Sequence, residues 1–218
     1  MLTPAAYHRL ARALPYPVGK VRFTGGEPLL RPDFREIVAA FADALPGCDL
    51  AVTTNGQLLT RRLPALHAAG LRRATVHVDS LRPGRYRELM GEGDVHEVLQ
   101  GALDARACLD QVKLNVVVQR DRNDDELRDF LDWSRRTGVE VRFIELMNTG
   151  SAVAYTRRAF VSGREIVRRL GATPLQRRSP GDPASLWRAP DGVVFGVIAS
   201  DTEPFCEACD RVRVSADG

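Results

Sequence analysis

Apolar and polar positions follow two alternating patterns along most of the chain. Residues 18–24 alternate in the manner of a strand, and residues 33–45 carry apolar side chains at helical spacing, with Pro32 near the start. The two patterns then repeat. They predict further strands at residues 49–53, 73–78, 112–118 and 139–144, and further helices at residues 58–69, 95–109, 124–136 and 162–170.

The order of these elements indicates the fold class. Strands that alternate with helices at this spacing form right-handed βαβ units, so we expect an α/β fold with a parallel sheet. The sheet would be either doubly wound or curled into part of a barrel. Residues 172–192, rich in proline, glycine and arginine, are predicted to form a loop, and a strand is expected at residues 193–199.

Composition narrows the class of protein. The chain has 218 residues and 44% hydrophobic content, enough for a sizeable core in one domain, or one domain with an appendage. It has no apolar run of about 18 residues, and its start lacks the apolar block of a secretory signal, so we expect a cytoplasmic protein without a membrane segment. The net charge is +3 and the basic residues are not interleaved with aromatics, which argues against nucleic acid and leaves a small anion open.

Lysine is rare in this chain. Of the 31 basic residues, only Lys20 and Lys113 are lysines, and alanine is abundant. This composition is typical of a mutational bias that replaces lysine wherever arginine serves equally well. A lysine that persists under such a bias indicates a place where a compact ammonium is needed and a planar guanidinium does not suffice.

The predicted strands carry charged residues on one face. In the first strand Lys20, Arg22 and Thr24 share one side, whereas Val21 and Phe23 share the other. A strand covered by helices on both sides should be apolar on both faces. Later strands repeat the polar face, with His77 and Asp79, Lys113 and Asn115, and Arg142. Extended chain after the last cysteine would place Arg211 and Arg213 on one side as well.

Six cations would then point toward one interior: Lys20, Arg22, Lys113, Arg142, Arg211 and Arg213. A buried charge without a partner costs several kcal/mol even after relaxation, so something anionic is expected there. A phosphate chain matches arginine forks and lysine point charges well. The alternative is that internal carboxylates, such as Glu27, Asp79 and Glu145, neutralise part of the charge.

Two glycine-containing turns and a pair of cysteines complete the candidate chemistry. The turns, Thr24-Gly25-Gly26-Glu27-Pro28 and Thr53-Thr54-Asn55-Gly56, follow predicted parallel strands, at the end where such sheets bind ligands. Cys206 and Cys209 form a CxxC pair, which in the cytosol is more often a metal or redox site than a disulfide. Cys48 and Cys108 stand alone and are interpreted as small buried hydrophobes.

Several motifs together resemble one family. RFTGGEPLLR, TTNG, VHVDS, KLNVVV, RFIELM and FCEACDRVRVSADG occur in the order seen in the GTP 3',8-cyclases, the radical S-adenosylmethionine (SAM) enzymes called molybdenum cofactor biosynthesis protein A. The resemblance implies a partial, TIM-like (β/α) barrel over residues 1–147 and a carboxy-terminal extension over residues 148–218 that binds a cluster. It also implies the conversion of GTP to the cyclic intermediate of the first step of molybdopterin synthesis, with SAM and two [4Fe–4S] clusters as cofactors.

The resemblance assigns roles to single residues, none of them a catalytic side chain. Gly26 and Met147 match SAM contacts, and His77 stands where the family motif has a serine that contacts SAM. Cys206 and Cys209 match two ligands of the second cluster. The positions that match GTP contacts are Arg22, Thr53, Lys113, Arg211 and Arg213, with Lys20 and Arg142 assigned to the phosphates.

The chain also departs from the family pattern. It contains no Cx3Cx2C motif for the first cluster, and it stops before the third carboxy-terminal cysteine. We therefore expect a fragment that is inactive by itself. Two alternatives stay open: a degenerate relative that binds a nucleotide without catalysis, and a small metal or thiol-redox protein built on Cys206 and Cys209. As partners the resemblance implies GTP and the enzyme that takes the cyclised product, and a homodimer is left open.

Overall fold

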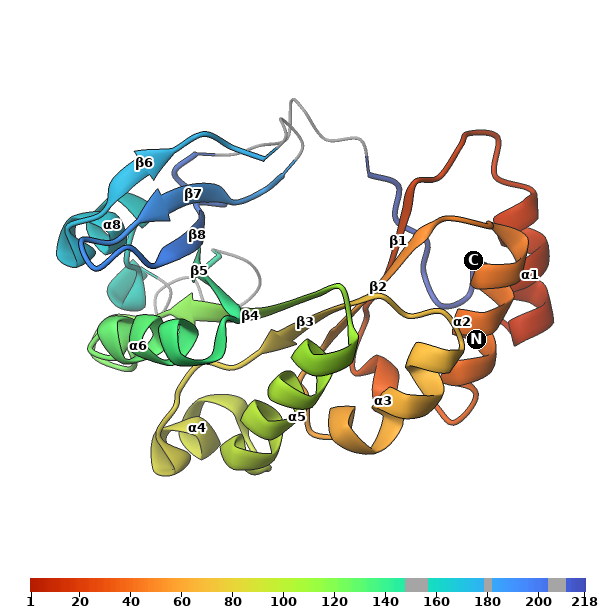
Figure 1. Cartoon of the computed structure of the whole chain (residues 1–218), viewed down its shortest axis with the longest axis horizontal. Coiled ribbons are helices and arrows are strands. Elements are labelled where there is room, and N and C mark those ends of the chain that lie inside the picture. The colour runs from red at the N-terminus through yellow and green to blue at the C-terminus, as the bar shows by residue number, and fades with distance from the viewer. Residues whose placement is uncertain (148–156, 179–181, 204–210) are drawn as a thin grey trace. The chain divides into compact units, whose positions relative to one another are not determined.

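The computed structural model describes residues 1–147, 157–178, 182–203 and 211–218 (Figure 1). The chain divides into two compact units. The first unit comprises Met1–His77, His96–Val112 and Val212–Gly218, and the second comprises Val78–Val95 and Lys113–Arg211.

The first unit holds three neighbouring parallel strands: β1 (Lys20–Phe23), β2 (Asp49–Thr54) and β3 (Arg73–His77). Its helices are α1 (Pro4–Arg12), α2 (Phe34–Ala44), α3 (Leu59–Ala68) and nearly all of α5 (Val95–Cys108), and a short 3-10 helix, η1, spans Pro28–Leu30. Every strand and helix predicted here is confirmed to within a few residues. The structure adds α1, whose first turn is capped by the Thr3 hydroxyl accepting from Ala6 N at 3.3 Å.

Helix α2 covers one face of β1. The ring of Phe23 lies 5.4 Å from that of Phe34 and 5.3 Å from that of Phe41, both on α2. Because side chains alternate along a strand, Lys20 and Arg22 lie on the face of β1 that α2 does not cover. The predicted division of this strand into an apolar and a charged face is therefore confirmed.

The second unit contains a mixed sheet in the order β4-β5-β8-β7-β6. Strand β5 (Glu140–Glu145) is parallel to β4 (Gln111–Val118) and to β8 (Val194–Ile198), whereas β7 (Ser185–Arg188) is antiparallel to both β8 and β6 (Thr173–Leu175). The helices of this unit are α4 (Pro83–Met90), α6 (Leu127–Thr137) and α8 (Gly163–Leu170). Sequence patterns predicted β4, β5, β8, α6 and α8, but α4 was missed.

The prediction of a loop at residues 172–192 was wrong. Strands β6 and β7 lie in this segment and pair in register, with Thr173 opposite Arg188 and Pro174 opposite Trp187. Both strands are short, of three and four residues, so neither shows a readable alternation of its own. Strand β7 pairs with the buried strand β8, and β6 pairs in turn with β7. This pairing is a tertiary effect that local composition does not report.

One face of β5 is also covered by a helix. Phe143 lies 6.2 Å from Phe130 of α6 and 5.7 Å from Phe195 of β8, measured between ring centroids. Glu140 and Arg142 alternate with Val141 and Phe143 and therefore share the opposite face. The two units thus follow one rule, with apolar side chains under a helix and charged side chains on the other side of the strand.

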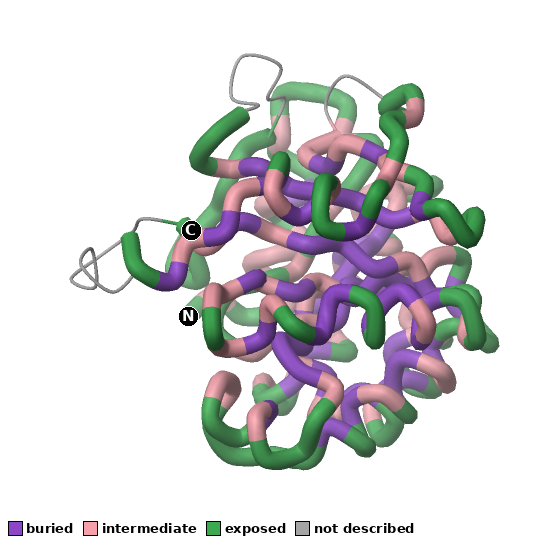
Figure 2. The backbone as a smooth tube through the Cα atoms, turned by 90° about the vertical axis from the view of Figure 1, so that its left-hand side faces the viewer, coloured by how far each residue is buried: buried purple, intermediate pink, exposed green. Residues whose placement is uncertain are grey.

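The buried positions concentrate in the strands and in the inward sides of the helices (Figure 2). Open, largely parallel sheets with flanking helices confirm the α/β class and agree with a partial TIM-like barrel. The domain boundary at residue 147 stays a prediction, since compactness does not test it. None of the helices that the structure describes is long and apolar enough to cross a lipid bilayer.

Candidate functional site

Glu27 ties together the two turns singled out by their sequence. Its Oε1 accepts from Leu29 N at 2.9 Å and from the buried Thr54 hydroxyl at 2.7 Å, while Oε2 accepts from Asn55 N at 2.6 Å. The turn after β1 and the turn at the end of β2 are therefore held by one carboxylate. Its bonds go to two peptide N–H groups and to a hydroxyl, so Glu27 organises the carboxyl ends of these strands.

The two glycines of the first turn, Gly25 and Gly26, differ in backbone conformation. Gly25 has φ of +136°, a conformation that side chains rarely adopt. Gly26 has no such φ, and a Cβ added there would meet no protein atom within 4 Å. Neither the backbone conformation nor protein packing explains the glycine at 26, and its exposed backbone is open to close approach by a ligand.

Arg22 is oriented by two threonines. One guanidinium nitrogen, Nη1, donates to the Thr53 hydroxyl at 3.1 Å and to the Thr75 hydroxyl at 3.0 Å. Thr53 and Thr75 are in register on β2 and β3, so their hydroxyls stand side by side. Arg22 and Thr53 thus lie in direct contact, and their role as GTP contacts stays a prediction. Lys20, also on β1, lies 3.1 Å from Asp49, a carboxylate that also contacts Arg73 at 2.7 Å.

The second unit contains what we call the buried basic cluster: Lys113, Glu140, Arg142, Arg178 and Asp182. Arg142 Nε donates to Glu140 Oε1 at 2.9 Å, and its Nη2 lies 3.4 Å from Asp182 Oδ2. Lys113 Nζ is 3.7 Å from the same Glu140 Oε1, and Arg178 Nη2 reaches Oε2 at 2.5 Å. Three cations therefore share two carboxylates, and the side chains of Lys113 and Arg142 are only 11% and 8% exposed.

Arg142 needs the glycine on the neighbouring strand. Gly196 of β8 is in register with Arg142, and a Cβ at 196 would lie 2.9 Å from Arg142 Cγ and 3.2 Å from Ala184 Cβ. Gly196 has no positive φ, so its backbone would accept other residues. The missing side chain leaves the room across which Arg142 extends toward Asp182.

Burial has a strong effect on Lys113. Desolvation, followed by the charge of Arg142, lowers the pKa of Lys113 to about 8, although Glu140 acts in the other direction. Burial raises the pKa of Glu140, but the hydrogen bond from Arg178 and the charge of Arg142 outweigh it and leave that pKa below its ordinary value. The cluster thus keeps the Glu140 carboxylate ionised beside a lysine whose ammonium is poorly compensated.

The carboxylates considered earlier as counter-ions mostly bond elsewhere. The fully buried Glu145 accepts from Gly163 N, Asp201 N, Thr202 N and the Thr202 hydroxyl at 2.5–3.0 Å. Asp79 accepts from Val117 N at 2.7 Å. Predicted cations do contact Asp49, Glu140 and Asp182.

The other predicted residues are placed as follows. His77 is half-buried at the end of β3, and Met147, after β5, is 52% exposed. Arg211 and Arg213 are exposed, in segments without regular secondary structure, and belong to different units. Cys206 and Cys209 lie outside the described residues, and among the residues that are described no group of three His, Cys, Asp or Glu could hold a metal ion. The convergence of all six cations stays a prediction.

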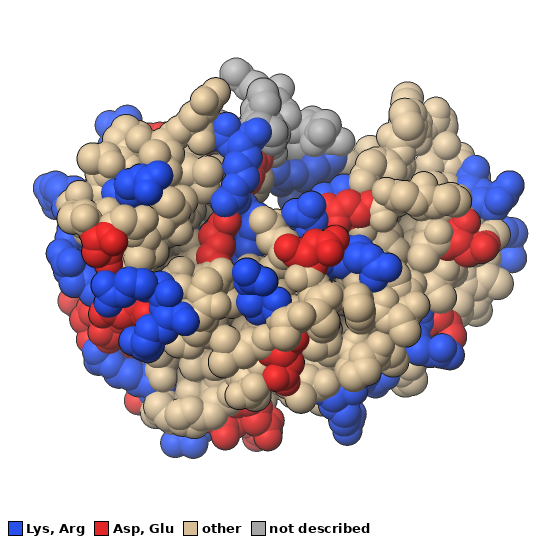
Figure 3. Space-filling view, viewed as in Figure 1, with Lys and Arg blue, Asp and Glu red and all other residues tan. Residues whose placement is uncertain are grey.

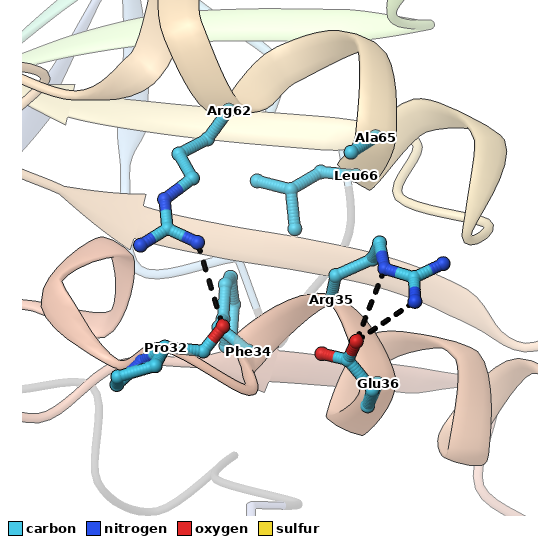
Figure 4. Close-up of a pocket in the computed structure, with 7 residues that line it drawn as sticks. All are labelled: Pro32, Phe34, Arg35, Glu36, Arg62, Ala65 and Leu66. Atoms are coloured by element: carbon cyan, nitrogen blue, oxygen red, sulfur yellow. Dashed lines mark hydrogen bonds and ion pairs between the residues drawn. The ribbon is translucent and has the colours of Figure 1, made fainter.

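Two pockets in the described parts of the chain differ in their relation to these residues. A cavity of about 100 Å³ lies between α2 and α3, where Arg62 Nη1 donates to Pro32 O and Arg35 pairs with Glu36 (Figure 4). It contains none of the predicted residues. An open pocket of about 450 Å³ in the second unit is lined partly by Glu140 and Arg178 and so reaches the buried basic cluster. On the face shown in Figure 3, basic side chains lie beside acidic ones.

Sequence reasoning missed four members of these sites. Glu140 stands two residues before Arg142 on one strand face, and Thr75 is in register with Thr53, so the alternation of side chains could have found both. Arg178 and Asp182 lie in the segment taken for a loop, where no sequence signal pointed to them.

Comparisons with known proteins identify the family. The profile described as the radical SAM superfamily matches residues 1–134, and the one described as Molybdenum Cofactor Synthesis C matches residues 139–218. The chain belongs to the radical SAM superfamily.

Curated relatives of this radical SAM chain share one name. A protein of Mycobacterium bovis named GTP 3',8-cyclase 3 is 41% identical over 210 residues, which cover 92% of this chain and 56% of the relative. A GTP 3',8-cyclase of Xanthomonas campestris pv. campestris is 42% identical over 209 residues, which cover 92% of this chain and 61% of the relative. The chain therefore spans roughly three-fifths of the length of these relatives. The resemblance derived from the motifs is confirmed.

Solved structures agree on the fold. The chain superposes on a crystal structure of Streptococcus suis SuiB with a TM-score of 0.55 and 18% identity, over 70% of this chain and 34% of that one. It also superposes on a domain of pyruvate-formate lyase-activating enzyme from Bacteroides vulgatus, with a TM-score of 0.55 and 15% identity. This match covers 70% of this chain and 93% of that domain. At such identities the likeness concerns the fold alone.

Proposed function

We propose that this chain carries the GTP-binding part of a GTP 3',8-cyclase, the radical SAM enzyme that converts GTP to the cyclic intermediate in the first step of molybdenum cofactor biosynthesis. The observation that carries the proposal is the buried basic cluster, in which three cations share two carboxylates. The names of the relatives supply the substrate.

The charge balance of the cluster favours an anionic ligand. The cluster holds three basic side chains and two acidic ones, a formal excess of one positive charge, in a place where Lys113 and Arg142 are almost fully buried. Such an excess is costly without an anion nearby. A phosphate oxygen beside Lys113 would compensate the charge and favour its protonated form, and arginine forks would orient the phosphate.

SAM and a cluster are the cofactors that the superfamily implies. When bound with a reduced [4Fe–4S] cluster, SAM supplies the radical that removes a hydrogen atom from the substrate. The open backbone of Gly26 fits close approach by SAM, with His77 and Met147 as further contacts by resemblance. Cys206 and Cys209 stay predicted ligands of the second cluster.

The first prediction tests GTP binding directly. The folded chain should bind GTP more tightly than guanosine in calorimetry, because most of the attraction is to the phosphates. Replacing Arg211 with alanine removes a charged hydrogen bond worth about 1.5–3 kcal/mol, so affinity should fall roughly ten- to a hundredfold. Arg211→Lys should recover little of it, since a point charge cannot reproduce a fork.

A matched control separates a specific contact from general charge loss. Arg128 is an exposed arginine on α6, and Arg128→Ala makes the same change in net charge. It should leave GTP affinity unchanged at two salt concentrations. Folded wild-type chain that binds guanosine as well as GTP would contradict the proposed function.

The remaining expectations belong to the same proposal. They are a cytoplasmic location, a partner enzyme that consumes the cyclised product, and the absence of a nucleic-acid partner. A homodimer belongs to the proposal as well, and so does the division into a barrel over residues 1–147 and an extension over residues 148–218.

A further inference from the structure

One carboxylate in the buried basic cluster contacts all three of its cations. Oε1 of Glu140 faces Arg142 Nε at 2.9 Å and Lys113 Nζ at 3.7 Å, while Oε2 faces Arg178 Nη2 at 2.5 Å. These cations come from β5, from β4 and from the segment between β6 and β7. Glu140 is thus the group through which three separate segments are joined.

Asp182 makes a direct ion pair with only one of the three cations. It contacts Arg142 Nη2 at 3.4 Å and accepts from Ala184 N at 3.1 Å. Its charge also acts on Lys113 and Arg178, but both of these make their direct ion pairs with Glu140. Without Glu140, Arg142 would keep a carboxylate partner, whereas Lys113 and Arg178 would lose the contacts described here.

We propose that Glu140 is a positioning residue for the nucleotide, which holds Lys113, Arg142 and Arg178 together as one phosphate-binding group. Arg178 is thereby a further phosphate contact of this chain. Its side chain is 42% exposed and lines the open pocket of about 450 Å³, so it is accessible to a ligand from solvent. The inference rests on the proposed function, since the phosphate is that of GTP.

The role of Glu140 can be tested because two explanations predict opposite signs. A carboxylate near a polyanion repels it, so if Glu140 only screened the cations, its neutralisation would strengthen GTP binding. If Glu140 positions the cations, Glu140→Gln should weaken binding. Glutamine keeps one oxygen acceptor and presents an amide donor to the remaining cation.

A pH profile gives a second readout. The charged groups that act on Lys113 are Arg142, Glu140, Arg178 and Asp182; burial and the two arginines favour its neutral form, and the two carboxylates favour the ammonium. Neutralising Glu140 removes an attractive partner and leaves both arginines in place. Lys113 should then lose its proton at lower pH than the wild-type value of about 8.

The experiment compares wild type, Glu140→Gln and Glu165→Gln. Glu165 is the matched control: it also bridges two arginines, Arg120 at 2.8 Å and Arg169 at 2.5 Å, and it is similarly buried, at 18% against 13% exposure. GTP affinity is measured by calorimetry from pH 6.5 to pH 9. Because the chain has only two lysines, ¹³C-labelled lysine gives one titrating signal for Lys113, assigned by its loss in Lys113→Met.

We expect Glu140→Gln to bind GTP about tenfold more weakly at pH 8, as for loss of one charged hydrogen bond. Binding should partly recover on acidification, and the Lys113 signal should titrate at lower pH. Glu165→Gln should match wild type in affinity and in that titration. If Glu140→Gln does not fold, Glu140→Asp, which keeps the charge but shortens the reach, should show the same weakening with a smaller change in titration.

Several results would overturn the role of Glu140. These are unchanged or tighter GTP binding by Glu140→Gln, an equal loss in Glu165→Gln, or weaker binding with an unchanged Lys113 titration. Wild-type chain that fails to bind GTP would overturn the proposed function instead, so the two failures are distinguishable.

Discussion

Replacing Lys113 with methionine is expected to stabilise the fold by about 3 kcal/mol at pH 7 while weakening GTP binding at least tenfold. The pKa of Lys113 falls from 10.5 to about 8 on folding, and each pKa unit corresponds to about 1.4 kcal/mol. Below pH 8 the folded protein therefore carries the full free-energy cost of burying the Lys113 ammonium. Methionine fills a similar volume without a charge, and Glu140 keeps Arg142 and Arg178 as partners.

The sign of the pH dependence follows from the same shift. Between about pH 8 and 10.5 the unfolded chain holds the lysine proton more tightly than the folded chain, so the stability of the wild type rises with pH. The advantage of Lys113→Met should fall to less than about half by pH 9.5. Urea denaturation of both proteins at pH 7 and 9.5 measures this, since other titrating groups cancel in the comparison.

Lys20 provides the control for stability. It is 42% exposed and paired with Asp49, so Lys20→Met should change the free energy of unfolding by no more than about 0.5 kcal/mol. A Lys113→Met variant that is less stable than wild type at pH 7 would show that the ammonium is well compensated in the fold. Stability gained together with loss of binding is what a lysine kept for function should give.

Glu145→Ala is expected to destabilise the protein by about 3–5 kcal/mol. The carboxylate is fully buried, and its removal leaves the peptide N–H groups of Gly163, Asp201 and Thr202 without their acceptor. Glu145→Gln should cost less, because one oxygen acceptor remains. Urea denaturation gives the magnitude, and hydrogen exchange at these three amides should accelerate.

Glu203 is the matched control for that experiment. It lies one residue beyond Thr202, is 47% exposed and meets Arg164 at 3.5 Å. Glu203→Ala should change stability by no more than about 0.5 kcal/mol. Equal effects of the two substitutions would mean that the buried bonds of Glu145 contribute little beyond a surface ion pair.

Much of the site was predictable because alternation along a strand is a local property. The charged face of Lys20 and Arg22 and the buried Arg142 follow from counting every second residue, and the structure shows the opposite faces under α2 and α6. The same counting would have found Glu140. Glu140 stands two positions before Arg142 and therefore on the same face of the strand. Because it stands at the start of the strand, it was not distinguished from a solvent-exposed position.

The rest of the site depends on pairings between distant segments. Arg178 reaches Glu140 over 38 positions of chain, and Asp182 reaches Arg142 over 40. Both belong to the hairpin of β6 and β7, which forms because β8 offers it a partner edge. Composition identified this stretch only as rich in proline and arginine. Helix α4 was missed for a different reason. Tyr86 is its single buried residue, so the helix has no stripe of buried apolar residues that a pattern could indicate.

Strand β6 ends the sheet of the second unit, and its sequence bears on self-association. It has three residues, with Pro174 in the middle, and proline has no peptide N–H to offer a further strand. An edge that is short and interrupted by proline resists the edge-to-edge pairing through which β-proteins aggregate. If two copies of this chain associate, β6 is therefore poorly suited to join them by extending the sheet from this edge.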